Sequence, residues 1–299
     1  MGITKEDSKF LFYSKTLGVS FDKTLTLGRQ YLYVTKPEIN EQISKFKNVD
    51  LSPDSVDFLD EYCEPLLKIL GSNHTDSMDF SAYEKATIIH DLNTPVAANL
   101  KNKFSVVLDS GTLEHIFDFK TAVKNCMEMV EIGGHFIGIT PVNNLMGHGF
   151  YQFTPELLFS VFSSQNGFQM VKMIIAACDE NGKFYQWYEV ANPAVIGSRL
   201  HLVNEHPTYV MYVAKKIAEV NIFETLPQQS DYVTTWKIHD VIQNNAASEE
   251  SKLKTFYRKR TPAFIKHSLY KLRKFFSKRQ VVTADLGKID PTHFKKMDV

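Results

Sequence analysis

Residues 104–153 read FSVVLDSGTLEHIFDFKTAVKNCMEMVEIGGHFIGITPVNNLMGHGFYQF and decide the fold. The apolar run 104–108 is typical of a parallel strand that is buried on both faces, and it stops at Asp109. Apolar residues then recur at helical spacing over 119–130, and a second apolar run begins a strand at 136–139. The stretch therefore predicts a strand, a helix and a parallel strand in succession.

The turns of this unit predict where a ligand would bind. Gly133-Gly134 is expected to end the helix in a left-handed conformation. The loops 109–115 and 140–153 each follow a strand and are polar. In an open α/β sheet the ligand lies beyond the carboxyl ends of the strands, so these two loops are expected to face it together.

The rest of the chain predicts further strands and helices of the same kind. Pro65 is expected to kink or split a helix that begins at Ser52-Pro53 and ends at Gly71. A second helix is predicted from Thr154-Pro155 to about Gly167. The expected additional strands are 23–27, 76–80, 86–89, 168–176 and an antiparallel edge strand at 209–214. Six or seven strands with intervening helices predict an α/β fold.

Composition bounds the class of protein. The chain has 299 residues, of which 43% are hydrophobic, so it can form a sizeable core. No apolar run approaches the roughly 20 residues that span a bilayer, and the N-terminus lacks the apolar core of a secretory signal. The three cysteines lie far apart without metal-ligand spacing, which predicts buried thiols, no metal site and a reducing, cytoplasmic compartment.

The charges divide the chain into a body and a tail. Residues 251–299 contain 14 Lys or Arg and three acids, which leaves 20 basic and 31 acidic residues in 1–250. We therefore expect a core domain at 1–218 with an insertion at 35–51, a linker or accessory element at 219–250, and a basic tail at 251–299.

The tail has the pattern of a basic amphipathic helix. Residues 258–279 contain nine Lys or Arg and no acid, and their apolar residues are spaced three or four apart. The apolar face has three possible partners: the body of the protein, a membrane interface or another protein. We favour an anionic membrane surface, reached through 255–279 at the inner face of the membrane. Nucleic acid is disfavoured because the aromatic residues share one stripe with aliphatic ones.

Several motifs together resemble the class I S-adenosylmethionine-dependent methyltransferases, specifically the branch found in sugar and cell-surface glycan biosynthesis clusters. The resemblance covers roughly residues 23–214. The motifs that carry it are LGRQ at 27–30, IIHDLN at 88–93, DSGTLEH at 109–115, GGHFIGITP at 133–141 and GHGFYQFTPELL at 147–158. It implies a doubly wound, mostly parallel seven-stranded sheet of the Rossmann-like type with an antiparallel last hairpin, S-adenosylmethionine as cofactor, and a basic helical appendage beyond it.

The resemblance also implies cofactor contacts near the first two strands. Gly28 corresponds to the glycine-rich turn at the methionine end of the cofactor, although Arg29 and Gln30 stand where the family has further glycines. Arg29 either pairs with the cofactor's carboxylate or is solvated. Asp79 corresponds to the acidic residue that binds both ribose hydroxyls, with Asp76 as the alternative.

The remaining implied contacts lie after the next two strands. Asp91 corresponds to the position that receives the adenine amino group, and the backbone of Leu92 is placed for a ring nitrogen. Asp109 corresponds to a residue near the methyl group.

The methyl acceptor is expected to bind beside Glu114, His148, Tyr151 and Phe153. The sulfonium already makes the methyl group electrophilic, so the protein mainly orients the acceptor and excludes water. A sugar hydroxyl or amine would also need a base, and His148 and His115 are the candidates by residue type, with His148 preferred. The alternative is a non-catalytic binding or scaffolding protein that keeps this fold, because fold does not decide function.

Overall fold

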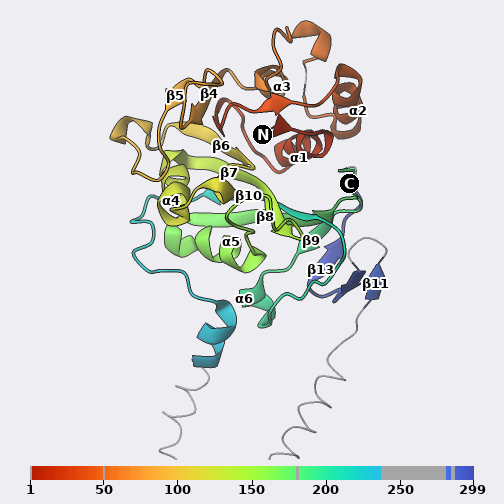
Figure 1. Cartoon of the computed structure of the whole chain (residues 1–299), viewed down its shortest axis with the longest axis vertical. Coiled ribbons are helices and arrows are strands. Elements are labelled where there is room, and N and C mark those ends of the chain that lie inside the picture. Colours follow the sequence, from red (N-terminus) through yellow and green to blue (C-terminus); the bar gives the residue numbers. More distant parts are fainter. Residues whose placement is uncertain (1, 50, 180–181, 237–280, 284–286) are drawn as a thin grey trace, which may run out of the picture.

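The computed structural model describes residues 2–49, 51–179, 182–236, 281–283 and 287–299. Its centre is a nine-stranded sheet in the order β13-β9-β8-β10-β7-β6-β2-β4-β5 (Figure 1). The strands of this sheet are β2 (Lys23–Leu27), β4 (His74–Asp79), β5 (Ile88–Ile89), β6 (Phe104–Ser110), β7 (Val130–Asn143), β8 (Phe168–Ala177), β9 (Tyr188–Val190), β10 (Thr208–Lys216) and β13 (Phe294–Lys296).

Seven of these strands correspond to strands predicted from the sequence, but β10, which we expected at an edge, lies inside the sheet. β5, β4, β2, β6 and β7 pair in parallel, and β10 lies antiparallel between β7 and β8. The carboxyl ends of β2, β4, β5, β6 and β7 therefore lie at one edge, and the order of the strands reverses between β2 and β6. The predicted α/β fold with a mostly parallel, seven-stranded core is confirmed.

Helices cover both faces of the sheet (Figure 1). One face packs against α1 (Lys5–Thr16), α2 (Lys36–Phe46) and α3 (Glu64–Ile69), and the other against α4 (Phe119–Met129) and α5 (Pro155–Val161). Successive residues of β6 point to opposite faces of the sheet. Val106 and Leu108 therefore belong to the hydrophobic core on the side of α1, α2 and α3, and Val107 belongs to the core on the side of α4 and α5. This is the doubly wound arrangement in which a strand is buried on both sides.

The smaller elements complete the connections. A two-stranded parallel pair is formed by β1 (Gly2–Ile3) and β3 (Tyr31–Leu32), and a hairpin by β11 (Val281–Thr283) and β12 (Gly287–Ile289). The short helices are η1 (Pro53–Ser55), η2 (Ala98–Leu100), η3 (Leu113–His115), η4 (Ser164–Asn166) and α6 (Pro193–Ile196).

A buried lysine joins the end of α4 to the sheet. Lys216, at the end of β10, is 3% exposed. Its Nζ donates to Asn102 Oδ1 at 2.7 Å, Met127 O at 3.1 Å and Val130 O at 2.8 Å. A cation at a helix C-terminus satisfies carbonyls that have no partner within the helix.

The structure corrects several boundaries. The helix predicted from Ser52 to Gly71 is only η1 and α3, since Pro65 lies in the first turn of α3, where a missing N–H is tolerated. Gly133 has a φ of 87° but lies within β7, at a register shift against β6, and α4 already ends at Met129.

The predicted insertion at 35–51 contains α2, which is part of the crossover from β2 to β4. It begins with a capping box between Thr35 and Glu38. α1, for which we made no prediction, begins with the same motif, formed by Thr4 and Asp7. The three cysteines are free and buried, as predicted.

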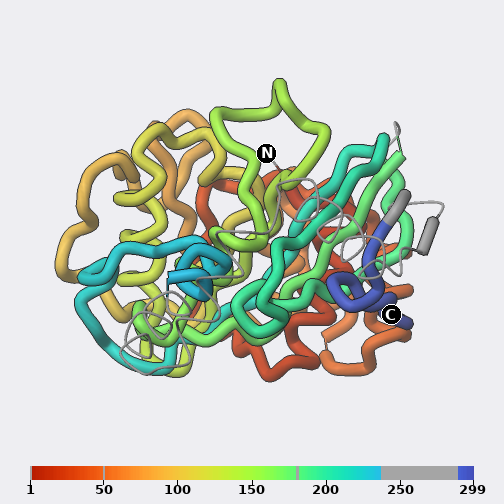
Figure 2. Tube along the Cα trace, turned by 90° about the horizontal axis from the view of Figure 1, so that it is seen from below, coloured from red at the N-terminus to blue at the C-terminus, as the bar shows by residue number. Residues whose placement is uncertain are grey.

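The end of the chain belongs to the sheet and not to a separate tail. β13 pairs with β9, and Phe294 is buried in the core, so the blue C-terminal segment lies beside the green strands (Figures 1 and 2). We expected a sheet of seven strands. The short strands β9 and β13 extend it to nine, and the buried residues of each pack into the core. The predicted amphipathic helix at 258–279 lies outside the described residues. Among the described residues, no helix has the length and apolar character required to cross a bilayer.

Candidate functional site

A cavity of about 400 Å³ opens at the carboxyl edge of the sheet. It lies where β2, β4 and β5 end, next to the loop that follows β6. Its lining residues are Gly28, Met78, Asp79, Phe80, His90, Asp91, Leu92, Asn93, Thr112, His115 and Ile116. The volume is within the range of small-molecule and cofactor sites, and the position is where open α/β sheets bind ligands.

Gly28 and Arg29 both follow β2, but only Gly28 lines the cavity. Gly28 has a φ of 68°, which favours glycine, and its N–H donates to Met78 O at 2.7 Å. The Arg29 side chain is absent from the cavity lining and is 16% exposed, with Nε at 2.7 Å from Glu64 Oε1 and Nη2 at 2.8 Å from Asp60 Oδ2. Its guanidinium also lies 3.8 Å from the centre of the Tyr62 ring. Arg29 is therefore not simply solvated: it is held by two carboxylates and a ring.

Asp79 and Asp91 both border the cavity. Asp79 Oδ1 accepts from the N–H of Ser81 at 3.1 Å. Asp91 Oδ1 accepts from the N–H and the side-chain amide of Asn93 at 2.9 and 2.8 Å, and these hydrogen bonds lower the pKa of Asp91. Among the described residues, no hydrogen bond reaches the second oxygen of either carboxylate. Each side chain is thus oriented by its own loop and keeps one oxygen for a ligand.

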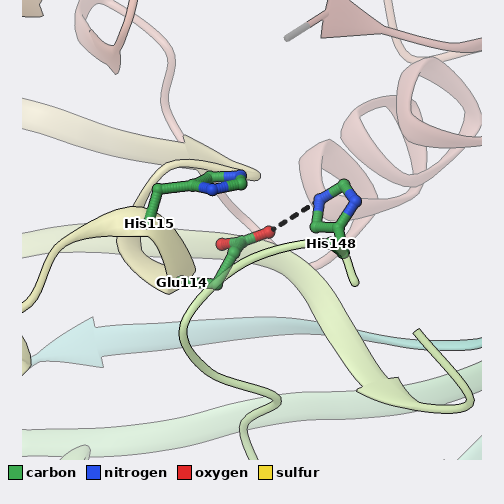
Figure 3. A group of neighbouring side chains, drawn as sticks. All are labelled: Glu114, His115 and His148. Atoms are coloured by element: carbon green, nitrogen blue, oxygen red, sulfur yellow. Dashed lines mark ion pairs between the residues drawn. The ribbon is translucent and has the colours of Figure 1, made fainter. Parts of the chain in front are cut away.

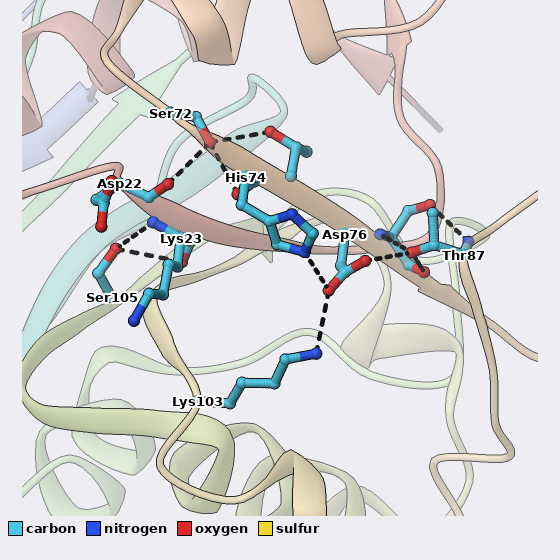
Figure 4. Close-up of polar contacts among 10 residues, drawn as sticks. Asp22, Lys23, Ser72, His74, Asp76, Thr87, Lys103 and Ser105 are labelled. Atoms are coloured by element: carbon cyan, nitrogen blue, oxygen red, sulfur yellow. Dashed lines mark hydrogen bonds and ion pairs between the residues drawn. The ribbon is translucent and has the colours of Figure 1, made fainter.

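Asp76, the alternative to Asp79, lies within β4 and does not border the cavity. Figure 4 shows its polar contacts. Its Oδ2 is 3.0 Å from His74 Nε2 and 3.3 Å from Lys103 Nζ, while Oδ1 accepts from Thr87 Oγ1 at 3.0 Å. Burial opposes ionisation, but hydrogen bonds from these three partners lower the pKa of Asp76. The residue joins neighbouring segments, so of the two aspartates only Asp79 is placed for a ligand.

Asp109 does not line the cavity, but it accepts a hydrogen bond from Thr112, which does. It is the sixth residue of β6, and its side chain is fully buried. Oδ1 accepts from the N–H groups of Thr112 and Leu113 at 2.9 and 3.3 Å, whereas Oδ2 has no hydrogen-bond partner among the described residues. Burial raises the pKa of Asp109, although the two backbone hydrogen bonds oppose this.

Glu114, His115 and His148 converge beside the cavity, which His115 lines (Figure 3). One side-chain oxygen or nitrogen from each residue lies within 4.8 Å of the other two. Glu114 is fully buried, and its Oε1 is 3.4 Å from His148 Nε2. Burial raises the pKa of Glu114, and the charge of Asp109 adds to this increase. The pKa of His115 is lowered by burial and by His148. These three residues are called the Glu-His-His cluster below.

The loop 144–153 carries His148 and is anchored to the backbone of Glu114. The N–H groups of Phe150 and Tyr151 both donate to Glu114 O, at 2.9 and 3.2 Å. Gly149 packs so closely there that an added Cβ would lie 2.9 Å from this same oxygen. The loop after β7 and the loop after β6 therefore form one unit.

Tyr151 and Phe153, predicted to contact the acceptor, pack on α4 instead of lining the cavity. The Tyr151 hydroxyl donates to Phe117 O at 2.7 Å. Phe153 is buried, with its ring 4.4 Å from that of Phe119. The exposed rings in this region are Phe117 and Phe150, which are 76% and 69% exposed and lie edge to face at 6.2 Å. Sequence reasoning missed this pair.

The structure thus brings most of the predicted residues to one region. Gly28, Asp79, Asp91, Leu92 and His115 line the cavity. Asp109, Glu114 and His148 lie next to it, while Arg29 and Phe153 point into other surroundings. Sequence reasoning did not identify Thr112 and Asn93 as lining residues, and it predicted no metal-binding group. The Glu-His-His cluster has no local spacing that would reveal it, because His148 comes from a different loop.

No protein-family model matches this chain. No curated protein matches it either. Solved structures with a similar fold include an S-adenosylmethionine-dependent methyltransferase from Archaeoglobus fulgidus, which is 12% identical with a TM-score of 0.37 over 71% of this chain and 95% of that one. The trans-methyltransferase CalH in complex with SAH is 10% identical, with a TM-score of 0.34 over 70% and 58% of the two chains.

A branched-chain polyamine synthase mutein from Thermus thermophilus is 12% identical, with a TM-score of 0.36 over 74% of this chain and 59% of that one. The matched region thus spans somewhat more than half of the CalH and polyamine synthase chains. Likenesses this weak concern the fold, and the function has to be argued from the site.

Proposed function

We propose that this chain is an S-adenosylmethionine-dependent methyltransferase that acts on a small-molecule or glycan acceptor. The observation that carries the proposal is the position of the cavity. It opens at the carboxyl edge where the strand order reverses, with Asp79 and Asp91 on its wall and the Glu-His-His cluster at its side. A nucleoside cofactor and an acceptor would meet there.

The two aspartates suit the nucleoside. Asp79 is the last residue of β4 and would accept hydrogen bonds from the ribose hydroxyls, and Asp91 follows β5 and would accept one from the adenine amino group. Leu92 is 6% exposed, and its backbone N–H would donate a hydrogen bond to a nitrogen of the adenine ring. Gly28 lets the backbone approach the methionine end. The methyl group would then lie toward Thr112 and His115, between the cavity and the cluster.

The acceptor would bind on the outer side of the cluster. We propose a sugar hydroxyl or amine as the methylated group, because the exposed rings of Phe117 and Phe150 offer apolar surface next to polar side chains. His148 and His115 are the catalytic residues of this proposal: they orient the acceptor and help it lose its proton. Orientation in line with the methyl group would supply most of the acceleration.

Titration calorimetry with S-adenosylmethionine tests the proposal directly. We expect micromolar affinity for the full chain, and a loss of at least about tenfold in Asp91→Ala, since a hydrogen bond to a charged group contributes about 1.5–3 kcal/mol. Asp57→Ala is the matched control, because Asp57 is exposed and lies outside the cavity lining. Absence of binding up to millimolar concentrations would reject the enzyme.

The second candidate is a non-catalytic binding protein with this fold. It is favoured by the turn after β2, where Gly28 is followed by the ion-paired Arg29 and then by β3, and not by the start of a helix. His148→Asn separates the two roles once cofactor binding is established. Turnover with a set of sugar and amine acceptors should fall strongly while cofactor affinity stays unchanged; an equal loss of both would contradict the role of His148.

A further inference from the structure

Glu114 carries a buried carboxyl group whose oxygens lack a hydrogen bond of good geometry, and burial makes this group costly to ionise. Its side chain is fully buried, and neither Oε1 nor Oε2 accepts a hydrogen bond of good geometry from the described residues, although the nearby Thr140 hydroxyl partly opposes the increase in the pKa of Glu114. The imidazole Nε2 of His148 lies 3.4 Å from Oε1. Buried carboxylates are normally paired, hydrogen-bonded or bound to a metal. Such a carboxyl group is suited to a cationic partner, and Figure 3 shows it directed between the two imidazoles.

From this arrangement we infer that Glu114, His115 and His148 form a binding site for one divalent transition-metal ion. Two imidazoles and one carboxylate are the ligand set of open zinc and iron(II) sites, which leave positions for a substrate. Their donor atoms already lie within 4.8 Å of one another. Both histidines are exposed, so small rotations of their side chains would complete the coordination. Hard cations such as Mg²⁺ prefer oxygen ligands and fit this set less well.

The charge around the cluster favours a cation. Asp109 and Glu114 are two fully buried carboxyl groups, and Asp109 Oδ2 also has no hydrogen-bond partner. Among the described residues, no lysine or arginine forms an ion pair with either of them. A divalent ion would neutralise this region without a protein cation.

The backbone also holds the ligands in place. Phe150 and Tyr151 donate their N–H groups to Glu114 O, so the loop that carries His148 cannot move away without losing both bonds. Glu114 and His115 share the short helix η3. A metal site needs such support to keep its ligands within a few tenths of an ångström of the required geometry.

The role of the ion rests on the proposed function, although the site itself does not. A bound cation makes a hydroxyl more acidic. The acceptor O–H would lose its proton to water, and its oxygen would form a bond to the methyl carbon. The C–S bond of the cofactor would break with its electron pair left on sulfur. The products would be a methyl ether and S-adenosylhomocysteine, and His115 and His148 would act through the ion.

Cobalt(II) and zinc(II) binding to the full chain tests the inference. The protein is first treated with a chelator and dialysed, and Co²⁺ is then titrated while the absorption of the bound ion is followed, with Zn²⁺ added as competitor. We expect one ion per chain and an affinity at least about tenfold weaker in His148→Asn and in Glu114→Gln. His201→Asn is the matched control, because His201 is exposed and outside the cluster.

The outcomes are distinct. Loss of binding in His148→Asn with full binding in His201→Asn supports the site, even if Glu114→Gln fails to fold. Equal binding by wild type and both histidine variants, or no binding up to millimolar metal, overturns it. S-adenosylmethionine affinity is measured in parallel on the metal-free protein. Cofactor binding without metal binding refutes only this inference, and metal binding without cofactor binding refutes only the proposed function.

Discussion

Replacing Gly149 by alanine tests whether close backbone packing holds His148 against Glu114. A Cβ at position 149 would lie 2.9 Å from Glu114 O and 3.2 Å from both Glu114 C and Cγ. Ordinary contacts of a Cβ begin at 3.4 Å, so the loop would have to move by about 0.5 Å. The obstacle is backbone, which cannot rotate away as the end of a flexible side chain can.

The size of the effect follows from the bonds at stake. The N–H groups of Phe150 and Tyr151 donate hydrogen bonds to Glu114 O at 2.9 and 3.2 Å, and a shift of that size would lengthen both bonds beyond good hydrogen-bond geometry. Each such bond contributes about 0.5–1.5 kcal/mol. The loop would therefore lose about 1–3 kcal/mol of local stability, which corresponds to opening that is about 5- to 150-fold more frequent.

Hydrogen exchange measured by mass spectrometry on peptides covering 144–153 reads this opening directly. Gly147→Ala is the matched control on the other side of His148, because nothing lies within 4 Å of a Cβ added there. Exchange should accelerate about 5- to 150-fold in Gly149→Ala and stay unchanged in Gly147→Ala. Equal exchange in the two variants would refute the reasoning that the backbone packing positions His148.

Three further predictions concern other parts of the chain. Lys216→Met should lower the free energy of unfolding by about 2–4 kcal/mol, because the three oxygens that now accept from Lys216 Nζ at 2.7, 2.8 and 3.1 Å would lose their donor. Urea unfolding measures the loss, and the exposed Lys215→Met is the control. Equal urea midpoints for the two variants would contradict the prediction. Burial lowers the pKa of His135 from 6.5 to about 4 in the folded protein. Between pH 6.5 and 4 the unfolded chain therefore binds a proton on His135 that the folded protein does not bind. Stability should therefore fall by up to about 3 kcal/mol as the pH drops from 6.5 to 4, and pH curves of wild type and His135→Leu that run parallel would refute this. Arg29→Met should destabilise the fold by about 1–2 kcal/mol because it breaks the ion pair with Glu64, and calorimetry should find cofactor affinity unchanged; a tenfold weaker affinity would instead place Arg29 at the cofactor.

The elements that sequence reasoning predicted well are those with a local signal. β6, α4 and β7 each bury a pattern of apolar residues whose period is set by the element itself. β9 and β13 have only three residues each and gain their stability from neighbouring strands, so no pattern within them predicts a strand. α1 could have been found from the capping box of Thr4 and Asp7.

The candidate site divides in the same way. Asp79 lies near the end of a predicted strand and Asp91 follows another, and parallel strands end at one edge, so their approach to a common cavity could be inferred from the chain. The direction of the Arg29 side chain could not, because its partners Asp60 and Glu64 come from a segment that we predicted as a helix kinked or split at Pro65, whereas the structure has only η1 and, from Glu64, α3.

By itself, the sequence determined the α/β class, the positions of the seven core strands and the edge of the sheet at which the candidate site lies, because periodicity and the direction of parallel strands are properties of the chain. Only the tertiary structure decided that Glu114 is buried without a hydrogen bond of good geometry and that His148 faces it across 3.4 Å. These depend on how two loops separated by a helix and a strand pack together, and no local pattern of residues encodes that distance.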